Sequence, residues 1–372
     1  MTIRLGVVAL AGPRNGGTYQ YSLSMLQALR HTAGFDITVY GDPQNRDFAA
    51  FGYPLRPFAE ARWRRPLSLA AHKFHLRLAD SFAAEDILLA PIYSLALLHS
   101  RKPFAFALHD LQEKYYPANF SWWQRAWRDN TNRTLLARAA RVICESEYVR
   151  ADIVRFYGTP EERIAVMPAP PQEQFVSESS REFLDSVRRR LALPERFLFY
   201  PAQFWPHKNH LRLIEAFGEV VRERPGVRLV LTGRKHSHDY DNVMATIERL
   251  GLNEQILILG YIDAGDLRAI YRLATALVMP SLFESVSIPV YEAFQMGTPV
   301  ATSNILTLPE QVGDAGLLFD PTSVASIKEA VLEIINDPAA ARERANRGRA
   351  RMAAMTPERY GGQLQALLDG MA

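Results

Sequence analysis

The chain has 372 residues, a length that at roughly 100–200 residues per domain predicts two domains, each able to bury its own core. Its 48% apolar and 22% charged residues are close to globular averages, so a disordered chain is not expected. With 43 Lys and Arg against 40 Asp and Glu, the net charge of +3 is too small for a dedicated nucleic-acid binder. We therefore expect no nucleic-acid partner.

Cysteine content and the N-terminal segment set the expected compartment. A single cysteine, Cys144, cannot form an intrachain disulfide or a cysteine-based metal cluster, which favours the reducing cytoplasm. The segment Met1–Gly12 superficially resembles a signal peptide, but a glycine-rich turn and an amphipathic helix follow at once, so we interpret it as a first buried strand. The sequence has no run of about 18 apolar residues, so we expect no membrane-spanning helix.

Short apolar runs alternate with helix-like stretches almost from end to end, which is typical of parallel sheets covered by crossover helices. These runs are too many for one open sheet, so two doubly wound α/β domains are expected. The expected strands are Ile3–Ala9, Phe35–Tyr40, Asp86–Ala90, Pro103–Leu108, Arg141–Cys144, Arg163–Met167, Phe197–Ala202, Val227–Thr232, Gln255–Leu259, Ala276–Pro280 and Pro299–Thr302.

The segment Met167–Pro194 opens with a proline run, which disfavours both helix and central strand, and continues through a serine-rich stretch to a charged helix. We therefore expect the domain boundary here. We expect a Rossmann-like N-terminal domain over residues 1–170 and a linker over 171–195. A second such domain follows over 196–355, and a C-terminal helix over 356–372 packs back on the first domain.

Two motifs of the first half could contact a ligand. Gly16 and Gly17 lie between the first strand and a helix, where backbone N–H groups can approach a phosphate, although a tight turn would use the same residues. His109 and Asp110 follow a strand, at the edge where open parallel sheets bind ligands. There a histidine can hydrogen-bond a substrate or stabilise charge, or it can be structural.

Cations follow two strands of the second half. We expect Lys208 to enter a helix N-terminus, where its charge opposes the macrodipole unless an anion binds there too. Arg234 and Lys235 follow the next strand along the chain. The pattern indicates a phosphate site, and solvated basic loops are the alternative.

Two glutamates stand eight positions apart in the most informative stretch of the sequence. Glu284 lies in a loop after a strand, and Glu292 lies on a short apolar helix with Pro289 in its first turn and Gly297 at its end. Carboxylates accept paired hydrogen bonds from vicinal hydroxyls, so the pair indicates a polyhydroxylated ligand. A structural role for Glu292, as an ion-pair or helix-dipole residue, is the alternative.

Together these motifs resemble the retaining family-four glycosyltransferases. The resemblance is most specific between Phe197 and Pro321, and its motifs are His207-Lys208-Asn209, the pair Glu284/Glu292, Gly297-Thr298-Pro299-Val300 and Leu308-Pro309-Glu310-Gln311-Val312-Gly313-Asp314. It extends more weakly to Gly16-Gly17 and His109-Asp110-Leu111. The resemblance implies the GT-B fold, with two doubly wound Rossmann-like domains and an interdomain cleft. It also implies transfer from a nucleotide sugar with retained anomeric configuration and no metal or other cofactor.

The resemblance also implies roles for individual residues. Catalytic roles fall to Lys208 at the diphosphate, Glu284 at the sugar hydroxyls and His109 beside the sugar. The implied donor-binding residues are Gly16, Gly17, Gln203, Arg234, Tyr261, Ile262, Glu292, Thr307 and Leu308. Among these, Glu292 would contact the ribose, Tyr261 and Ile262 the base, and Thr307 and Leu308 would offer backbone N–H groups to the phosphates.

One position departs from the family pattern. Gln203 stands where the family usually has an arginine that shares the diphosphate. An amide supplies a hydrogen bond but no charge, so either Arg234 or His207 compensates or the leaving group is stabilised less. We favour compensation by Arg234.

Basic and aromatic residues cluster in the first half of the chain. Such clusters suit a peripheral contact with the inner face of an anionic membrane. A solvated face with ordinary core aromatics is the alternative. The residues are Arg56, Arg62, Trp63, Arg64, Arg65, Lys73, Phe74 and Arg77 in a first cluster, and Trp122, Trp123, Arg125, Trp127 and Arg128 in a second.

The function expected from the sequence is that of a retaining hexosyltransferase, with mannosyl transfer favoured. It would use a GDP- or UDP-sugar and a glycan or lipid-linked acceptor, in the synthesis of a cell-surface polysaccharide. A sugar-nucleotide epimerase of the same architecture and a non-catalytic nucleotide-sugar-binding protein are the alternatives. A nicotinamide dehydrogenase is disfavoured because no Gly-x-Gly-x-x-Gly follows a strand.

Overall fold

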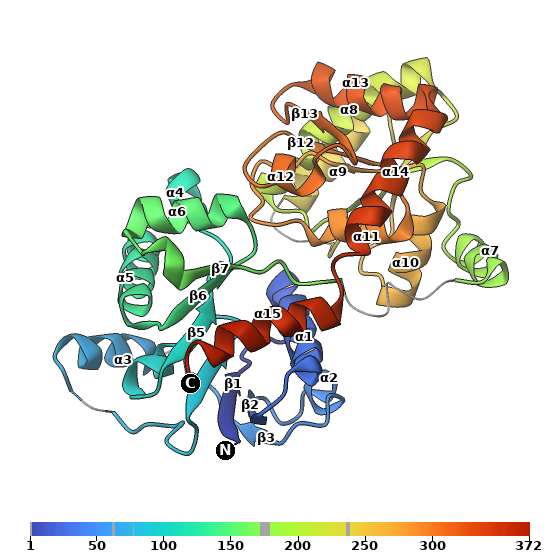
Figure 1. Ribbon diagram of the computed structural model, residues 1–372. Helices are drawn as coiled ribbons and strands as arrows, with labels where there is room; N and C mark the ends of the chain where they lie inside the picture. The colour runs from blue at the N-terminus through green and yellow to red at the C-terminus, as the bar shows by residue number, and fades with distance from the viewer. Residues whose placement is uncertain (1, 62–63, 77, 172–178, 236–238) are drawn as a thin grey trace. The chain divides into compact units, whose positions relative to one another are not determined.

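A computed structural model describes residues 2–61, 64–76, 78–171, 179–235 and 239–372 (Figure 1). The chain folds into two units. Unit 1 comprises Met1–Pro170 and Met355–Ala372, and unit 2 comprises Pro171–Ala354.

Unit 1 contains a seven-stranded parallel sheet of order β3-β2-β1-β4-β5-β6-β7. Its strands, helices and 3-10 helices (η) are β1 (Ile3–Val8), η1 (Pro13–Asn15), α1 (Gly17–Ala28), η2 (Leu29–His31), β2 (Phe35–Gly41), α2 (Arg46–Ala49), β3 (Leu55–Pro57), α3 (Arg64–Lys73), β4 (Ile87–Ala90), η3 (Leu95–His99), β5 (Phe104–Ala107), α4 (Gln112–Tyr115), η4 (Pro117–Asn119), α5 (Trp122–Arg138), β6 (Arg141–Cys144), α6 (Glu147–Tyr157), η5 (Glu161–Arg163), β7 (Ile164–Val166) and α15 (Pro357–Asp369).

Unit 2 contains a six-stranded parallel sheet of order β10-β9-β8-β11-β12-β13. Its elements are α7 (Arg181–Arg190), β8 (Phe197–Pro201), η7 (Pro206–Lys208), α8 (His210–Glu223), β9 (Arg228–Thr232), α9 (Tyr240–Arg249), β10 (Ile256–Ile258), α10 (Ala264–Leu273), β11 (Ala276–Met279), α11 (Ile288–Met296), β12 (Val300–Ser303), α12 (Leu308–Val312), β13 (Leu317–Phe319), α13 (Val324–Asn336) and α14 (Pro338–Met352).

The central strands confirm the α/β reading of the sequence. β4, β5 and β11 are buried at every residue, as expected for strands whose two faces are both covered by helices. Each apolar run that the sequence offers as a strand coincides with one, with ends that differ by at most one residue. Doubly wound sheets in both units follow from this pattern.

Two edge strands, β3 and β13, are missing from the sequence-based expectation, which is therefore incomplete. Arg56 interrupts the pattern of β3, and the three apolar residues of β13 make a run shorter than the four to eight that indicate a strand. β3 also ends on Pro57, which an edge strand tolerates because its N–H side can face away from the ladder.

The segment 171–195, expected as a linker, carries a helix in its described part. α7 lies in unit 2, and Arg190 at its end forms a bidentate ion pair with Asp266 of α10, with N–O distances of 2.8 and 2.6 Å. The sequence indicates this charged helix, and its Val187 is fully buried.

The C-terminal segment 356–372 contains α15, which belongs to unit 1 and lies beside α1 (Figure 1). Tyr360, Leu364 and Leu368 are buried in the same core as Met25 and Leu26 of α1. The last helix of the chain therefore completes one face of the first sheet.

Candidate functional site

The strand order of unit 2 reverses between β8 and β11, the point at which open α/β sheets bind ligands. The loop after β8 carries Lys208, and the loop after β11 carries Glu284. Both predicted catalytic residues of this unit therefore leave the sheet on either side of its switch point.

Lys208 is held in a short turn whose backbone is fixed on two sides. It is the last residue of η7, and the Tyr200 hydroxyl donates to its carbonyl O at 2.9 Å. The N–H of Leu282 donates to the neighbouring His207 carbonyl at 2.7 Å. The expectation that Lys208 enters the helix itself is wrong, because Pro206 starts a separate 3-10 turn and Asn209 adopts a left-handed conformation (φ 58°) before α8 begins.

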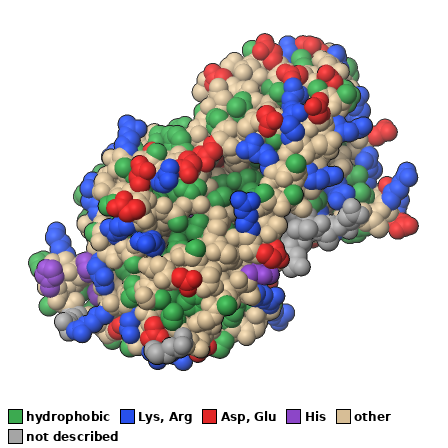
Figure 2. All heavy atoms as spheres, viewed as in Figure 1, with side chains coloured by type: hydrophobic (Ala, Val, Ile, Leu, Met, Phe, Trp, Pro, Cys, Tyr) green, Lys and Arg blue, Asp and Glu red, His purple; other side chains and the backbone are tan. Residues whose placement is uncertain are grey.

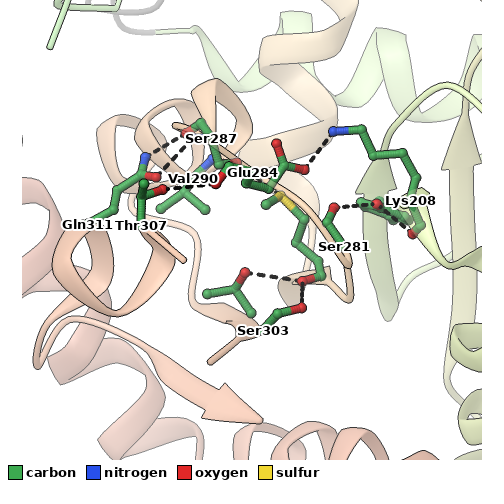
Figure 3. Close-up of polar contacts among 11 residues, drawn as sticks. Lys208, Ser281, Glu284, Ser287, Val290, Ser303, Thr307 and Gln311 are labelled. Carbon is green, nitrogen blue, oxygen red and sulfur yellow. Dashed lines mark hydrogen bonds and ion pairs between the residues drawn. The ribbon is translucent and has the colours of Figure 1, made fainter. Parts of the chain in front are cut away.

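Glu284 and Lys208 form an ion pair, a contact that the sequence analysis does not predict (Figure 3). The Lys208 Nζ lies 2.6 Å from Glu284 Oε1, and the two side chains are 18% and 10% exposed. Since water reaches both groups poorly, their attraction is screened less than on an open surface. The residue predicted to bind the diphosphate, Lys208, thus contacts the residue predicted to bind the sugar, Glu284.

The loop that carries Glu284 is fastened to the next helix along the sheet edge (Figure 3). The Thr307 hydroxyl donates to the Glu284 carbonyl at 3.3 Å. Gln311 of α12 accepts from the Ser287 N–H at 2.9 Å and donates to the Ser287 carbonyl at 2.6 Å. Ser287 also caps α11, so these bonds fix both the Glu284 loop and the start of that helix.

Thr307 and Leu308 lie beside this loop, but the backbone N–H of Leu308, expected to bind a phosphate, already has a hydrogen-bond acceptor. Leu308 starts α12, and its N–H donates to the Ile305 carbonyl at 3.0 Å. A phosphate would have to displace that carbonyl to use the Leu308 N–H, contrary to the simple expectation. Thr307 is buried, with its hydroxyl on the Glu284 carbonyl.

Gln203 and Arg234, which the sequence linked as amide and compensating cation, are neighbours. The backbone N–H of Arg234 donates to Gln203 Oε1 at 3.0 Å, and the Arg234 side chain is exposed. A Cβ on Gly233, the residue before Arg234, would lie 2.5 Å from the Ala202 carbonyl O, so only glycine allows the two loops to approach this closely. Tyr261 and Ile262 follow β10 at the same sheet edge, and Tyr261 is 76% exposed.

Glu292 lies within α11, which Pro289 and Gly297 (φ 71°) bound as the sequence predicts. Its carboxylate accepts the Tyr271 hydroxyl of α10 at 2.7 Å. Burial raises the pKa of Glu292 to about 7, against a smaller lowering by the Tyr271 hydrogen bond. The residue is thus anchored in the core, and its role at a ribose stays a prediction.

The raised pKa of Glu292 predicts a pH-dependent stability. Between about pH 4.5 and 7 the folded chain holds a proton that the unfolded chain has released, so stability falls as pH rises through this window. The loss amounts to about 3 kcal/mol. Glu292→Gln keeps an acceptor for Tyr271 but cannot titrate, so its Tm is expected to fall less than the wild-type Tm between about pH 5 and pH 8. Equal falls in the two proteins would contradict this.

In unit 1, Gly16 and His109 lie after strands on either side of the reversal between β1 and β4. Gly16 has a φ of 56°, which favours glycine, and starts α1 with Gly17 as its first residue. The His109 Nδ1 lies 2.8 Å from Glu145 Oε2, and its Nε2 lies 2.8 Å from the Pro91 carbonyl. Both ring nitrogens thus face acceptors, an arrangement that favours the doubly protonated imidazolium.

Glu145 is a residue that the sequence reading missed. Burial alone would lower the pKa of His109, but the hydrogen bond and the charge of Glu145 outweigh it, and the net pKa is raised. An acidic residue directly after the strand Arg141–Cys144 was the available signal. With both nitrogens engaged, His109 would offer a sugar its positive ring rather than a free N–H.

The His109 ring is also packed through a chain of aromatic residues to the C-terminal helix. The ring lies edge-on to Tyr21, with centroids 4.7 Å apart. The Tyr360 hydroxyl of α15 donates to the Tyr21 hydroxyl at 2.8 Å. Helix α15 therefore supports the residue that the sequence places beside the sugar.

No group of three or more His, Cys, Asp or Glu side chains is placed to hold a metal ion within the described ranges. The Lys208 ammonium lies 2.6 Å from Glu284 Oε1. Residues of the chain itself are thus present to meet a phosphate charge.

Two family descriptions match the chain. Glycosyltransferase Family 4 matches residues 15–170, and Glycosyl transferases group 1 matches residues 185–351. The two ranges together take in most of the sequence and meet both structural units.

Curated relatives include mannosyltransferases of bacterial polysaccharides. The chain is 30% identical to the O-antigen chain mannosyltransferase B of Escherichia coli over 203 residues, 54% of this chain and 53% of the relative. It is 24% identical to the O-antigen chain mannosyltransferase RfbU of Salmonella typhimurium over 333 residues, 87% and 88% of the two chains. The chain spans about half the length of the first relative and 26% of the E. coli mannosyltransferase WbdA.

Solved structures share the fold. Anabaena Alr3699/HepE in complex with UDP superposes with a TM-score of 0.78 at 17% identity, over 99% of this chain and 100% of that one. WaaG, a glycosyltransferase involved in lipopolysaccharide biosynthesis, gives a TM-score of 0.71 at 16% identity, over 99% and 100% of the two chains. The two-domain GT-B fold predicted from the sequence is confirmed.

Proposed function

Because the chain belongs to the family-four glycosyltransferases of GT-B fold, we propose that it is a retaining hexosyltransferase that uses a nucleoside diphosphate sugar. Its acceptor is a glycan or lipid-linked sugar in the synthesis of a cell-surface polysaccharide. The observation that carries the proposal is the Lys208–Glu284 pair at the switch point of unit 2, since it offers a cation for the diphosphate and a carboxylate for sugar hydroxyls at one place.

Mannosyl transfer is favoured because the relatives in E. coli and Salmonella typhimurium are named as mannosyltransferases. The nucleotide is GDP or UDP. The HepE structure in complex with UDP and glucose supports nucleotide-sugar binding on this fold, at 17% identity.

The proposed sugar transfer proceeds without a covalent intermediate on the protein. The bond between the anomeric carbon and the diphosphate oxygen breaks, and the acceptor oxygen bonds to that carbon on the same face. A phosphate oxygen takes the proton of the acceptor hydroxyl. Charge develops on the departing diphosphate, so the main demand on the protein is electrostatic, and Lys208 meets it.

No metal or cofactor is part of this proposal. The Lys208 ammonium supplies positive charge to the diphosphate, and Arg234 and the Gln203 amide lie at neighbouring loops of the same edge. We therefore expect turnover to persist in the presence of EDTA.

Two measurements test the proposed function. Thermal shifts with GDP, UDP and their glucose and mannose derivatives identify the nucleotide, because a ligand that binds the folded state raises the Tm. Incubation with the donor alone then separates the activities. Slow release of nucleoside diphosphate and free sugar supports the transferase, epimerised nucleotide sugar supports the epimerase, and binding without either product supports a non-catalytic binding protein.

A peripheral contact with an anionic membrane is proposed for the segment around α3. Leu67, Phe74, Leu76 and Leu78 are 44–71% exposed, and Lys73 beside them is exposed as well. Figure 2 shows cationic and histidine side chains beside hydrophobic ones at the left edge, where Figure 1 places α3. No helix in the part of the chain that the structure describes is long and apolar enough to cross a membrane.

The structure divides the two basic and aromatic clusters that the sequence suggested. Arg62, Trp63 and Arg77 lie outside the described residues, as does the side chain of Arg64, and Arg65 pairs with Glu60 at 3.1 Å. In the second cluster, Trp122 and Trp123 are stacked and about two-thirds exposed.

Arg128 of the second cluster is not available to a membrane. It binds Asp110 and Glu113, each at 2.7 Å, and Trp127 is half-buried. Of the second cluster, Trp122, Trp123 and Arg125 are thus exposed, whereas Arg128 is engaged within unit 1.

The membrane contact predicts a local effect of two substitutions. Phe74→Ser with Leu76→Ser is expected to weaken binding to phosphatidylglycerol vesicles at low salt about tenfold or more, since burying one such side chain contributes roughly 1.5–3 kcal/mol. Leu318→Ser, at an exposed leucine of β13 in unit 2, is the matched control and leaves binding unchanged. Co-sedimentation measures both. Equal binding by all three proteins would remove the membrane assignment.

A further inference from the structure

The Lys208–Glu284 pair is built into a rigid part of unit 2 (Figure 3). The Asn209 amide donates to the carbonyls of Pro280 and Pro321, at 2.9 and 2.8 Å, so the residue after the lysine is tied to the strand end before the glutamate. The Tyr200 hydroxyl has one proton, which it gives to the Lys208 carbonyl, so Ser281 donates to Tyr200 at 3.0 Å. Both charged side chains are thus held close together by their backbones.

A ligand that binds Lys208 must also deal with Glu284. Removing one partner of a poorly hydrated ion pair leaves the other charge buried and uncompensated, which is strongly unfavourable. A diphosphate that takes the ammonium therefore leaves a carboxylate that needs hydrogen-bond donors. The position of the pair couples the binding of phosphates to the binding of hydroxyl groups.

A nucleotide sugar and a sugar-free nucleoside diphosphate meet this requirement differently. The donor brings phosphate oxygens for Lys208 and sugar hydroxyls for Glu284, so both charges are satisfied when the pair separates. The nucleoside diphosphate brings phosphates alone. It has to compete with Glu284 for Lys208, or leave the carboxylate without a partner.

Resting on the proposed function, we infer that the Lys208–Glu284 pair makes unit 2 discriminate between its nucleotide-sugar donor and the nucleoside diphosphate that transfer releases. Glu284 is a specificity-determining residue in this account, because it competes with the product for the lysine. Loss of the sugar to the acceptor restores the ion pair and expels the product.

The experiment compares the affinities of the two ligands by calorimetry on the full chain. The probes are GDP with GDP-mannose, and UDP with UDP-glucose. Glu284→Gln removes the charge at nearly constant shape, and its amide still bonds to hydroxyl groups. We expect it to bind the nucleoside diphosphate more tightly than wild type. The ratio of the two dissociation constants, product over donor, is expected to fall about tenfold or more.

Matched variants separate this effect from a general change in charge. Glu254→Gln makes the same charge change at an exposed residue of unit 2 and leaves the ratio as in wild type. In a Lys208→Gln background, Glu284→Gln no longer tightens the binding of the nucleoside diphosphate, because the competed group is absent. Glu284→Ser serves as a second variant if the glutamine variant does not fold.

The outcomes are distinguishable. If wild type binds neither member of either ligand pair, the proposed function fails. If wild type binds a nucleotide sugar and its nucleoside diphosphate but the folded Glu284 variants keep the wild-type ratio, the proposed function stands and the discrimination by the ion pair is overturned. A lower ratio in the Glu254 control would overturn it as well.

Discussion

Lys208→Met is expected to lower kcat by about 10²–10³-fold at saturating donor, because it removes the cation that faces the departing diphosphate. Steady-state release of nucleoside diphosphate measures the effect. Truncation also leaves the buried Glu284 carboxylate without its partner at 2.6 Å, so a lower Tm is expected for the single variant.

A double variant separates the two consequences. Lys208→Met with Glu284→Gln has no unpaired charge, so it is expected to recover the Tm without recovering kcat. Lys328→Met is the charge-matched control, since Lys328 of α13 pairs with Glu223 at 2.7 Å away from the site. A folded Lys208→Met enzyme with full kcat would falsify the assignment of the diphosphate to this lysine.

Gly361→Ala is expected to destabilise the chain by roughly 1–3 kcal/mol, through overpacking between α15 and the first helix of unit 1. A Cβ at this position would lie 2.6 Å from the Ala28 carbonyl and 2.7 Å from the His31 Cβ, and neither atom is the end of a flexible side chain. The expected fall in Tm is a few degrees. Tyr360 precedes this glycine, so the packing of Tyr21 and His109 is disturbed too.

The neighbouring glycine is the natural control. A Cβ at Gly362 meets no atom within 4 Å, and the residue lies in the same helix. Gly362→Ala is therefore expected to keep or raise the Tm, because alanine favours a helix interior by up to about 1 kcal/mol over glycine. Thermal unfolding of both variants decides the matter. Equal Tm changes would show that α15 does not pack against α1 as described.

Much of the fold was predictable because the central strands are buried on both faces. β5 is apolar at every position, and its helical neighbours show a different period, so strand and helix separate in the sequence. The edge strands β3 and β13 were not predicted, since each has three residues and lies outside any run of four or more apolar residues. The edge strands β7 and β10 are equally short, but each lies within an apolar run of four residues and was predicted.

The site was predictable where a residue follows a strand, and less so where two residues meet across the chain. The positions of Lys208 and Glu284 at the carboxyl edge follow from strand order alone. Their ion pair joins residues 76 positions apart, and the pairing of His109 with Glu145 spans 36. Such partners depend on the register and curvature of loops, which no local pattern encodes.

The hydrogen bonds that hold the site residues in place were not predictable from the sequence either. Tyr200 reads as an apolar residue of a buried strand, and only the folded chain brings its hydroxyl to the Lys208 carbonyl. Glu292 shows the converse, since its spacing from Glu284 suggested a shared ligand whereas its carboxylate is bonded to Tyr271 in the core. Spacing identifies candidates, and packing decides what each side chain touches.

The most direct test of the central claim is the product formed from GDP-mannose or UDP-glucose and a simple alkyl hexoside acceptor. Nucleoside diphosphate release and the anomeric configuration of the new bond are measured together by NMR. The account predicts one nucleoside diphosphate released per glycoside formed, the configuration of the donor retained, and both products lost in Lys208→Met. Inverted configuration, epimerised donor, or wild-type product formation by a folded Lys208→Met enzyme would contradict it.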